Sequence, residues 1–88
     1  MKKIYVMRMS ENWNPDFIEA HSTLRGVAES ILKLAVEDEY YPEITAEELI
    51  KIMGARERFV DILLTDDAEL EEWIEKTGMT VTAILLEK

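Results

Sequence analysis

Carboxylates are the side chains of this 88-residue sequence whose number and spacing could support a function. The chain has 19 acidic residues against 10 Lys and Arg, which gives a formal charge of −9. Twelve of the acids lie in two windows, residues 37–48 and 66–75, and neither window contains a Lys or Arg. The other seven acids and all ten basic residues leave the rest of the chain with a charge of +3. The sequence therefore describes a mildly basic domain with two acidic patches.

The second window contains a regular stripe of acids. Asp67, Glu71 and Glu75 are spaced four apart, so on a helix they share one face at steps of about 6 Å along the axis. Like charges at this spacing destabilise a helix by roughly 0.2–0.5 kcal/mol per pair, and only Lys76 follows as a counter-charge. The spacing indicates a surface that attracts basic side chains by competing with DNA phosphates for them. The alternative interpretation is that these acids are ordinary solvated helix faces.

Binding through these patches would involve acids from both windows. The candidate partner-binding carboxylates are Glu37, Asp38, Glu39, Glu43, Asp67, Glu71 and Glu75.

The same charge argues against direct contact with nucleic acid or an anionic membrane surface, because both are negatively charged. The apolar run near the start is interrupted at Arg8, which is too short for a signal peptide, and no later stretch has the length of a membrane span. The chain has no cysteine, as is typical of intracellular proteins. We therefore expect a cytoplasmic protein.

Catalytic and metal-binding patterns are not found in the sequence. His21 is the only histidine, and with no cysteine or second histidine it does not make a metal site. Its position before a helix favours a structural role. Asp66 and Asp67 could act as an acid and base pair, but an exposed helix start would not shift either pKa. The glycines are isolated and form no phosphate-binding loop. We expect no enzyme activity, no cofactor and no metal.

Trp13 is a second type of candidate. It lies in the turn Asn12-Trp13-Asn14-Pro15, where a large ring can be exposed and act as a binding hot spot. The simpler interpretation is that the ring folds back over the edge of the sheet.

The pattern of apolar residues predicts the elements that position these groups. Strands are expected over residues 2–9, 17–21 and 79–86. Helices are expected from Ser22 or Thr23 to about residue 39, from a capping box of Thr45 and Glu48 to a left-handed Gly54, and from residues 65–67 to Gly78. In the first helix the expected buried face is Leu24, Val27, Ala28, Ile31, Leu32, Ala35 and Val36, and in the last it is Leu70, Trp73 and Ile74. Residues 56–64 fit either a helix or a strand, and a helix is preferred because only Gly54 separates them from the preceding helix.

These elements predict an α+β fold in a single domain over residues 1–88: a small antiparallel sheet of two to three strands covered by three to four helices. The first and last strands are apolar on both faces. A sheet with one solvated face carries polar residues there, so the second face is expected to be covered. The cover is either helices of the same chain or a second copy in a homodimer.

The opening strand Lys3-Ile4-Tyr5-Val6-Met7, the polar turn, the strand Phe17-Ile18-Glu19-Ala20 and the helix start His21-Ser22-Thr23 resemble the β-β-α start of small phage proteins. With the acidic windows, the chain is similar to acidic phage host-takeover proteins, which include a DNA-mimic inhibitor of the nucleoid protein HU. The resemblance implies a basic nucleic-acid-binding host protein as partner. The alternative is another inhibitor, of the anti-restriction, anti-CRISPR or antitoxin-like kind, that binds through Trp13 and apolar sheet residues.

Overall fold

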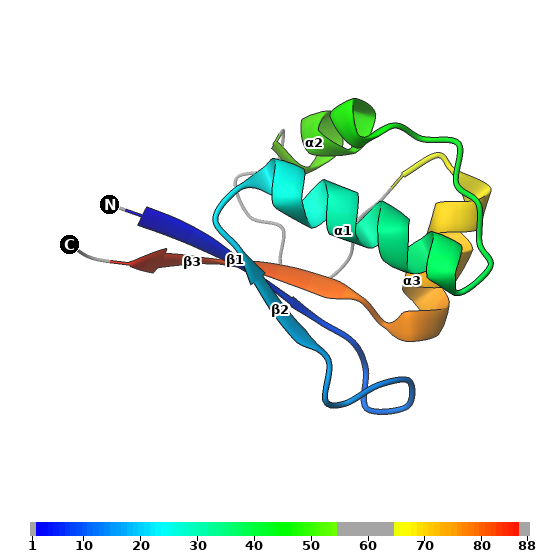
Figure 1. Ribbon diagram of the computed structural model, residues 1–88, viewed down its shortest axis with the longest axis horizontal. Helices are drawn as coiled ribbons and strands as arrows, with labels where there is room; N and C mark the ends of the chain where they lie inside the picture. Colours follow the sequence, from blue (N-terminus) through cyan, green and yellow to red (C-terminus); the bar gives the residue numbers. More distant parts are fainter. Residues whose placement is uncertain (1, 55–64, 87–88) are drawn as a thin grey trace.

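Among the residues that the structure describes, three antiparallel strands form a sheet in the order β2-β1-β3, and three helices pack against it. The computed structural model describes residues 2–54 and 65–86, and Figure 1 shows their arrangement. The predicted α+β class with a small antiparallel sheet is confirmed. In chain order the elements are β1 (Lys2–Arg8), β2 (Ile18–His21), α1 (Leu24–Glu37), α2 (Ala46–Gly54), α3 (Ala68–Thr77) and β3 (Thr80–Leu86).

The register of the sheet determines which side chains face the helices. Met7 of the central strand β1 lies opposite Glu19 of β2 and Val81 of β3. Because side chains alternate along a strand, this row and the row of Tyr5 lie on one face. Tyr5, Met7 and Val81 are buried on that face.

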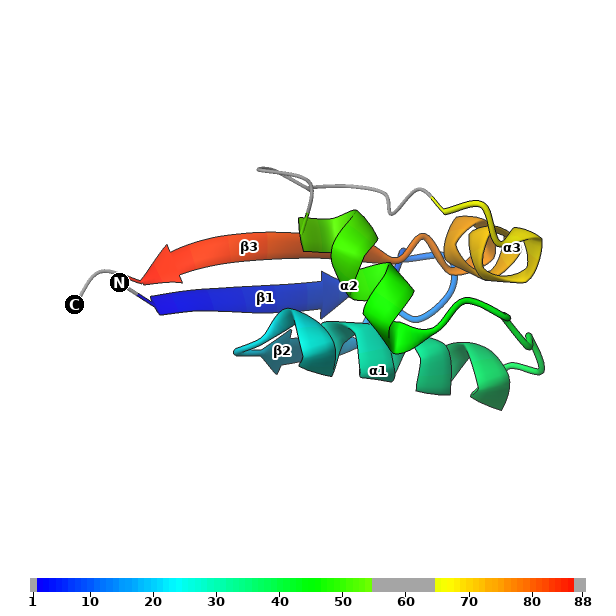
Figure 2. The same ribbon diagram turned by 90° about the horizontal axis from the view of Figure 1, so that it is seen from above.

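All three helices lie on one side of the sheet, with α1 and α2 over the strands and α3 beyond the end where β1 finishes and β3 begins (Figures 1 and 2). The core between the layers includes Ile31 of α1, Leu49 and Met53 of α2, and Trp73 of α3. The second face of the sheet was expected to be covered either by helices of the same chain or by a second copy. No helix formed by residues 2–54 and 65–86 covers this face.

Helix α1 begins as predicted, with Thr23 as its N-cap accepting a hydrogen bond from the Gly26 N–H at 3.1 Å. Its buried side chains are Val27, Ala28, Ile31 and Ala35. The inclusion of Val36 in the buried face was wrong, since this side chain is 48% exposed. A 3.6-residue period places Val36 at the margin of the stripe, and only the packed partner decides on which side it lies.

Helix α2 starts with the predicted capping box. The Glu48 N–H donates to Thr45 Oγ1 at 3.2 Å, and the Thr45 N–H donates to Glu48 Oε1 at 3.1 Å. The left-handed conformation expected at Gly54 is not observed, because Gly54 is still helical and a left-handed glycine is described only at Gly78. The interpretation of residues 56–64 as a helix lies outside the described residues.

Helix α3 begins and ends where the sequence predicts, after residues 65–67 and before Gly78. Asp67 is the N-cap, and Gly78 has a φ of 65° at the C-terminal end. A side chain at Gly78 would also collide with Ser10, whose Cβ lies 2.6 Å from the position of an added Cβ. This glycine lets the chain turn directly from α3 into β3. In the described part of the chain, no helix has the length and apolar character needed to cross a membrane.

Candidate functional site

The fold joins the two acidic windows, which are separated in the sequence by residues 49–65. The Glu43 and Ile44 N–H groups donate to Asp67 Oδ2 at 2.7 and 2.9 Å, and the Tyr41 N–H donates to Glu69 Oε2 at 3.3 Å. These bonds fasten the loop after α1 to the start of α3. The loop acids and the α3 acids therefore form one surface.

A second connection ties α3 to the end of α1. The indole N–H of the fully buried Trp73 donates to Asp38 Oδ2 at 2.8 Å. We call the resulting surface the acidic end of the molecule. Its members are Glu37, Asp38, Glu39, Glu43, Asp66, Asp67, Glu69, Glu71, Glu72 and Glu75.

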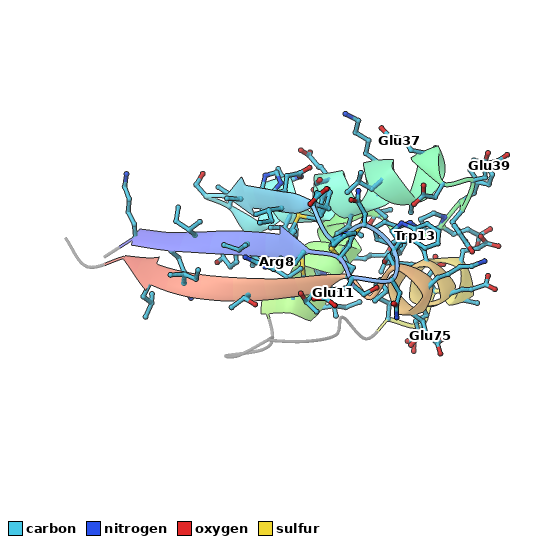
Figure 3. The ribbon with its side chains drawn as sticks, turned by 90° about the horizontal axis from the view of Figure 1, so that it is seen from below. Arg8, Glu11, Trp13, Glu37, Glu39 and Glu75 are labelled. Atoms are coloured by element: carbon cyan, nitrogen blue, oxygen red, sulfur yellow. The ribbon has the colours of Figure 1, made fainter. Side chains whose placement is uncertain are left out.

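Figure 3 shows Glu37, Glu39 and Glu75 pointing outward at this end. The acidic-end carboxylates form no ion pair with any other residue in the ranges 2–54 and 65–86, where the two pairs found are His21–Glu19 and Arg25–Glu47. Lys76 lies nearby, with its Nζ 6.0 Å from the centre of the Tyr40 ring. The surface is thus strongly anionic.

Two of the seven predicted binding carboxylates, Asp38 and Asp67, accept hydrogen bonds from other parts of the fold and so have structural roles. Asp67 accepts hydrogen bonds from the Leu70 N–H at 3.1 Å as well as from Glu43 and Ile44. Burial raises the pKa of Asp67, but these backbone donors outweigh it and the net pKa is lowered. Asp38 accepts a hydrogen bond from the indole N–H of Trp73. Replacing Asp67 with lysine would therefore remove hydrogen bonds that hold the loop after α1 to α3.

The other five predicted carboxylates are exposed, and their side chains make no hydrogen bond to the described residues. They are Glu37, Glu39 and Glu43 from the first window and Glu71 and Glu75 from the second. The structure thus brings the seven predicted carboxylates to one end of the molecule. Two of them hold the fold together by hydrogen bonds, and the other five are exposed. Sequence reasoning could identify Asp67 as a cap, but its bonds to Glu43 and Ile44 depend on tertiary packing.

Glu39 has an unusual backbone conformation. Its φ is 66°, in the left-handed region that glycine or asparagine usually occupies after a helix. The Tyr40 N–H donates to the Ala35 carbonyl at 2.9 Å and the Glu39 N–H to the Val36 carbonyl at 2.9 Å, which is the Schellman pattern. A glutamate here is strained relative to glycine by roughly 1 kcal/mol.

Trp13 lies in a tight turn between β1 and β2. The Trp13 and Asn14 N–H groups both donate to the Ser10 carbonyl at 3.1 Å. Trp13 is 42% exposed and lies toward the same end of the molecule as Glu39 and Glu75 (Figure 3). It remains available for contact with a partner.

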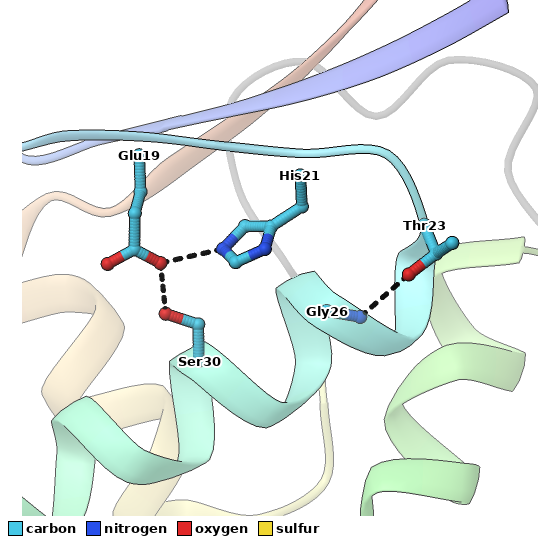
Figure 4. A network of polar contacts seen from close by, with 5 residues as sticks. All are labelled: Glu19, His21, Thr23, Gly26 and Ser30. Atoms are coloured by element: carbon cyan, nitrogen blue, oxygen red, sulfur yellow. Dashed lines mark hydrogen bonds and ion pairs between the residues drawn. The ribbon is translucent and has the colours of Figure 1, made fainter.

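A separate polar cluster joins β2 to α1 (Figure 4). His21 Nε2 donates to Glu19 Oε1 at 2.6 Å, and the Ser30 hydroxyl donates to the same oxygen. Burial raises the pKa of Glu19, but the hydrogen bonds from Ser30 and His21 outweigh it and lower the pKa overall. In a Ser-His-Asp triad the serine bonds to the imidazole and the carboxylate lies behind it, whereas here Ser30 and His21 both donate to the carboxylate of Glu19. These hydrogen bonds hold β2 against α1, a contact of the kind that a structural role for His21 predicts.

The described residues contain no group of three or more histidine and carboxylate side chains arranged to hold a metal ion. The chain matches no protein-family model, and comparisons with curated proteins and with solved structures also find no match.

Proposed function

We propose that this protein binds a basic nucleic-acid-binding protein through its acidic end and blocks that protein from nucleic acid. The observation that supports the proposal is that acids from two distant windows meet in the acidic end, whose carboxylates form no ion pair with a Lys or Arg of the described residues. In this proposal the target is a bacterial protein of the nucleoid type, and binding takes place in the cytoplasm.

The physical basis is competition between carboxylates and phosphates. A DNA-binding surface attracts anions with clustered Lys and Arg. Exposed carboxylates from α1, the following loop and α3 offer such a surface an alternative set of anions on a folded scaffold. Opposite potentials also steer the two proteins together and raise the association rate.

The strained Glu39 supports the same proposal. Glycine would relieve the positive φ at this position, yet the chain has an exposed glutamate there. Strained residues are concentrated at functional sites. A carboxylate kept in a strained conformation on an anionic surface is consistent with use of that surface.

The proposal is tested by reversing free carboxylates and leaving the structural ones intact. In Glu71→Lys and Glu75→Lys we expect affinity for a purified nucleoid protein to fall about tenfold or more for each substitution. Glu29→Lys is the matched control, since Glu29 is an exposed mid-helix glutamate of α1 outside the acidic end. Circular dichroism checks the fold of each variant, and calorimetry measures the affinity.

Two further conditions of this experiment separate mimicry from nonspecific attraction. Raising the salt from about 50 to about 500 mM should weaken binding steeply, because exposed charges are screened within about 8 Å at physiological ionic strength. Duplex DNA should displace this protein from the nucleoid protein. Cytochrome c, a basic protein of another class, should bind this protein much more weakly than the nucleoid protein does. Equal losses for Glu29→Lys and Glu71→Lys, or no effect of DNA, would contradict the proposal.

The exposure of Trp13 supports a second candidate, an inhibitor that recognises a different target by apolar contact. In that case Trp13→Ala would cost at least about 2 kcal/mol of binding free energy, and salt would have little effect. In the mimicry proposal Trp13→Ala leaves binding of the nucleoid protein within about twofold. The same calorimetric series decides between the two.

A further inference from the structure

The face of the sheet turned away from the helices is apolar and exposed. The strand register places Ile4 and Val6 of β1 on this face beside Ile18 of β2 and Ile84 of β3. Ile18 is 56% exposed and Ile84 is 44% exposed. Figure 3, seen from below, shows the strands in front with the helices behind them. Among the described residues, nothing packs on this face.

The charge of this face differs from that of the rest of the molecule. In a chain with 19 acids and a net charge of −9, none of its nine described side-chain positions is acidic. Two of them, at the ends of β1, are basic. The nine are Lys2, Ile4, Val6, Arg8, Ile18, Ala20, Thr80, Thr82 and Ile84. Two copies can therefore approach each other through this face without bringing acidic groups together.

We propose that this face binds a second copy of the chain, giving a two-fold dimer in which the two sheets stack. This inference does not depend on the proposed function. A face-to-face pair has its two-fold axis in the plane between the sheets, either along the strands or across them. An axis along the strands would place both acidic ends side by side, and the repulsion between them disfavours it. An axis across the strands places the acidic ends at opposite ends of the dimer.

The antiparallel arrangement places Lys2 of each copy near Arg8 of the other, and acidic side chains in the turn after Arg8 offset this like-charge contact at the margins. In each copy Lys2 begins β1 at the end of the sheet that lies far from the acidic end. With the axis across the strands, Lys2 approaches the end where the chain of the other copy leaves the sheet into its turn. That turn carries Glu11 and Asp16, both exposed.

The size of the face indicates how stable the dimer is. Three strands about 4.8 Å apart, the longest rising about 3.4 Å per residue over seven residues, give a flat footprint of roughly 300 Å². Standard stable interfaces bury about 800 Å² on each partner. We therefore expect a weak dimer that forms as concentration increases, and not an obligate one.

The test is sedimentation velocity of the full chain from about 1 to about 500 µM, with variants of two neighbouring residues on β3. Ile84 and Leu85 are similarly exposed, at 44% and 57%, but they point to opposite faces of the sheet. Ile84→Asp places a charge in the proposed interface and should raise the dimer Kd by at least about tenfold. Leu85→Asp should leave the Kd within about twofold.

Each other outcome overturns the proposal. A monomer over the whole concentration range would show that no second copy binds. Equal weakening by Ile84→Asp and Leu85→Asp would indicate pairing through the edge of β3 instead of its face. Full dimerisation of a well-folded Ile84→Asp variant would place the interface elsewhere. Circular dichroism of both variants establishes that they fold.

Discussion

At the scale of single residues, the acidic end contains two kinds of carboxylate. Asp38 and Asp67 accept hydrogen bonds from other elements, whereas Glu39, Glu71 and Glu75 are exposed and make none with the described residues. Composition alone treats all of them as equivalent charges. Their contacts show that only the second kind is available to a partner.

Glu39 provides the clearest test of this distinction. Glycine adopts a φ of 66° without strain, so Glu39→Gly should raise the free energy of unfolding by about 0.5–1 kcal/mol. The same substitution at Glu37, inside α1, should lower it by up to about 1 kcal/mol. Urea denaturation at neutral pH measures both. A loss of stability in Glu39→Gly would show that the side chain makes a stabilising contact.

Asp67 should behave in the opposite way. Asp67→Ala removes the acceptor for the N–H groups of Leu70, Glu43 and Ile44, and should cost roughly 2 kcal/mol of unfolding free energy. Asp66→Ala, at the neighbouring exposed residue, should cost less than about 0.5 kcal/mol. Equal effects would mean that the hydrogen bonds of Asp67 contribute little.

The lowered pKa of Asp67 adds a pH dependence to this comparison. A carboxylate with a depressed pKa in the folded state stabilises the protein above its unfolded pKa, and that stability is lost as pH falls through the folded pKa. The difference in unfolding free energy between the wild type and Asp67→Asn should therefore be largest near neutral pH. It should shrink as the pH is lowered below about 4. A difference that stayed constant on acidification would contradict an ionised role for Asp67.

At the scale of elements, the short strand β2 is held to α1 by an unusual fit. An added Cβ at Gly26, in the first turn of α1, would lie 2.8 Å from His21 Nδ1. The ring of His21 has little freedom to withdraw, because its other nitrogen is bonded to Glu19. A glycine that costs helix stability is thus required for the imidazole to fit.

A double-mutant cycle tests this fit. Alanine normally stabilises a helix by up to about 1 kcal/mol relative to glycine, but Gly26→Ala should destabilise this protein by roughly 1–2 kcal/mol because of the collision with His21. In a His21→Ala background the same substitution should become stabilising by about 0.5–1 kcal/mol. Thermal or urea unfolding of the four proteins gives the coupling. Additive effects would show that His21 moves aside freely.

At the scale of the whole molecule, opposite properties are separated in space. Carboxylates gather where α1 and α3 meet, whereas the outer face of the sheet has apolar and basic side chains at its described positions. An axis across the strands would produce an elongated dimer with an acidic surface at each end. Such a dimer could engage two basic proteins at once, or two sites of one symmetric protein.

Local patterns in the sequence were sufficient to predict most elements and their boundaries. The capping box at Thr45 and Glu48, the N-terminal position of Asp67 and the end of α3 at Gly78 are all formed by residues within a few positions of each other. These features depend mainly on neighbouring backbone groups, so sequence spacing was enough to predict them, whereas the left-handed conformation predicted at Gly54 is not formed. The two acidic windows and the apolar alternation on both faces of β1 were likewise visible in the sequence.

Only the tertiary structure decided how these parts combine. The exposure of Val36, the engagement of Asp38 by Trp73 and the bonds from Glu43 and Ile44 to Asp67 all join residues that are far apart in the chain or depend on which helix packs where. A charge pattern contains no information about which carboxylate meets a backbone donor from another element. The sequence by itself determined the elements and the excess of acid, whereas packing decided that acids of the two windows meet on one surface and that none of the described residues covers the outer face of the sheet.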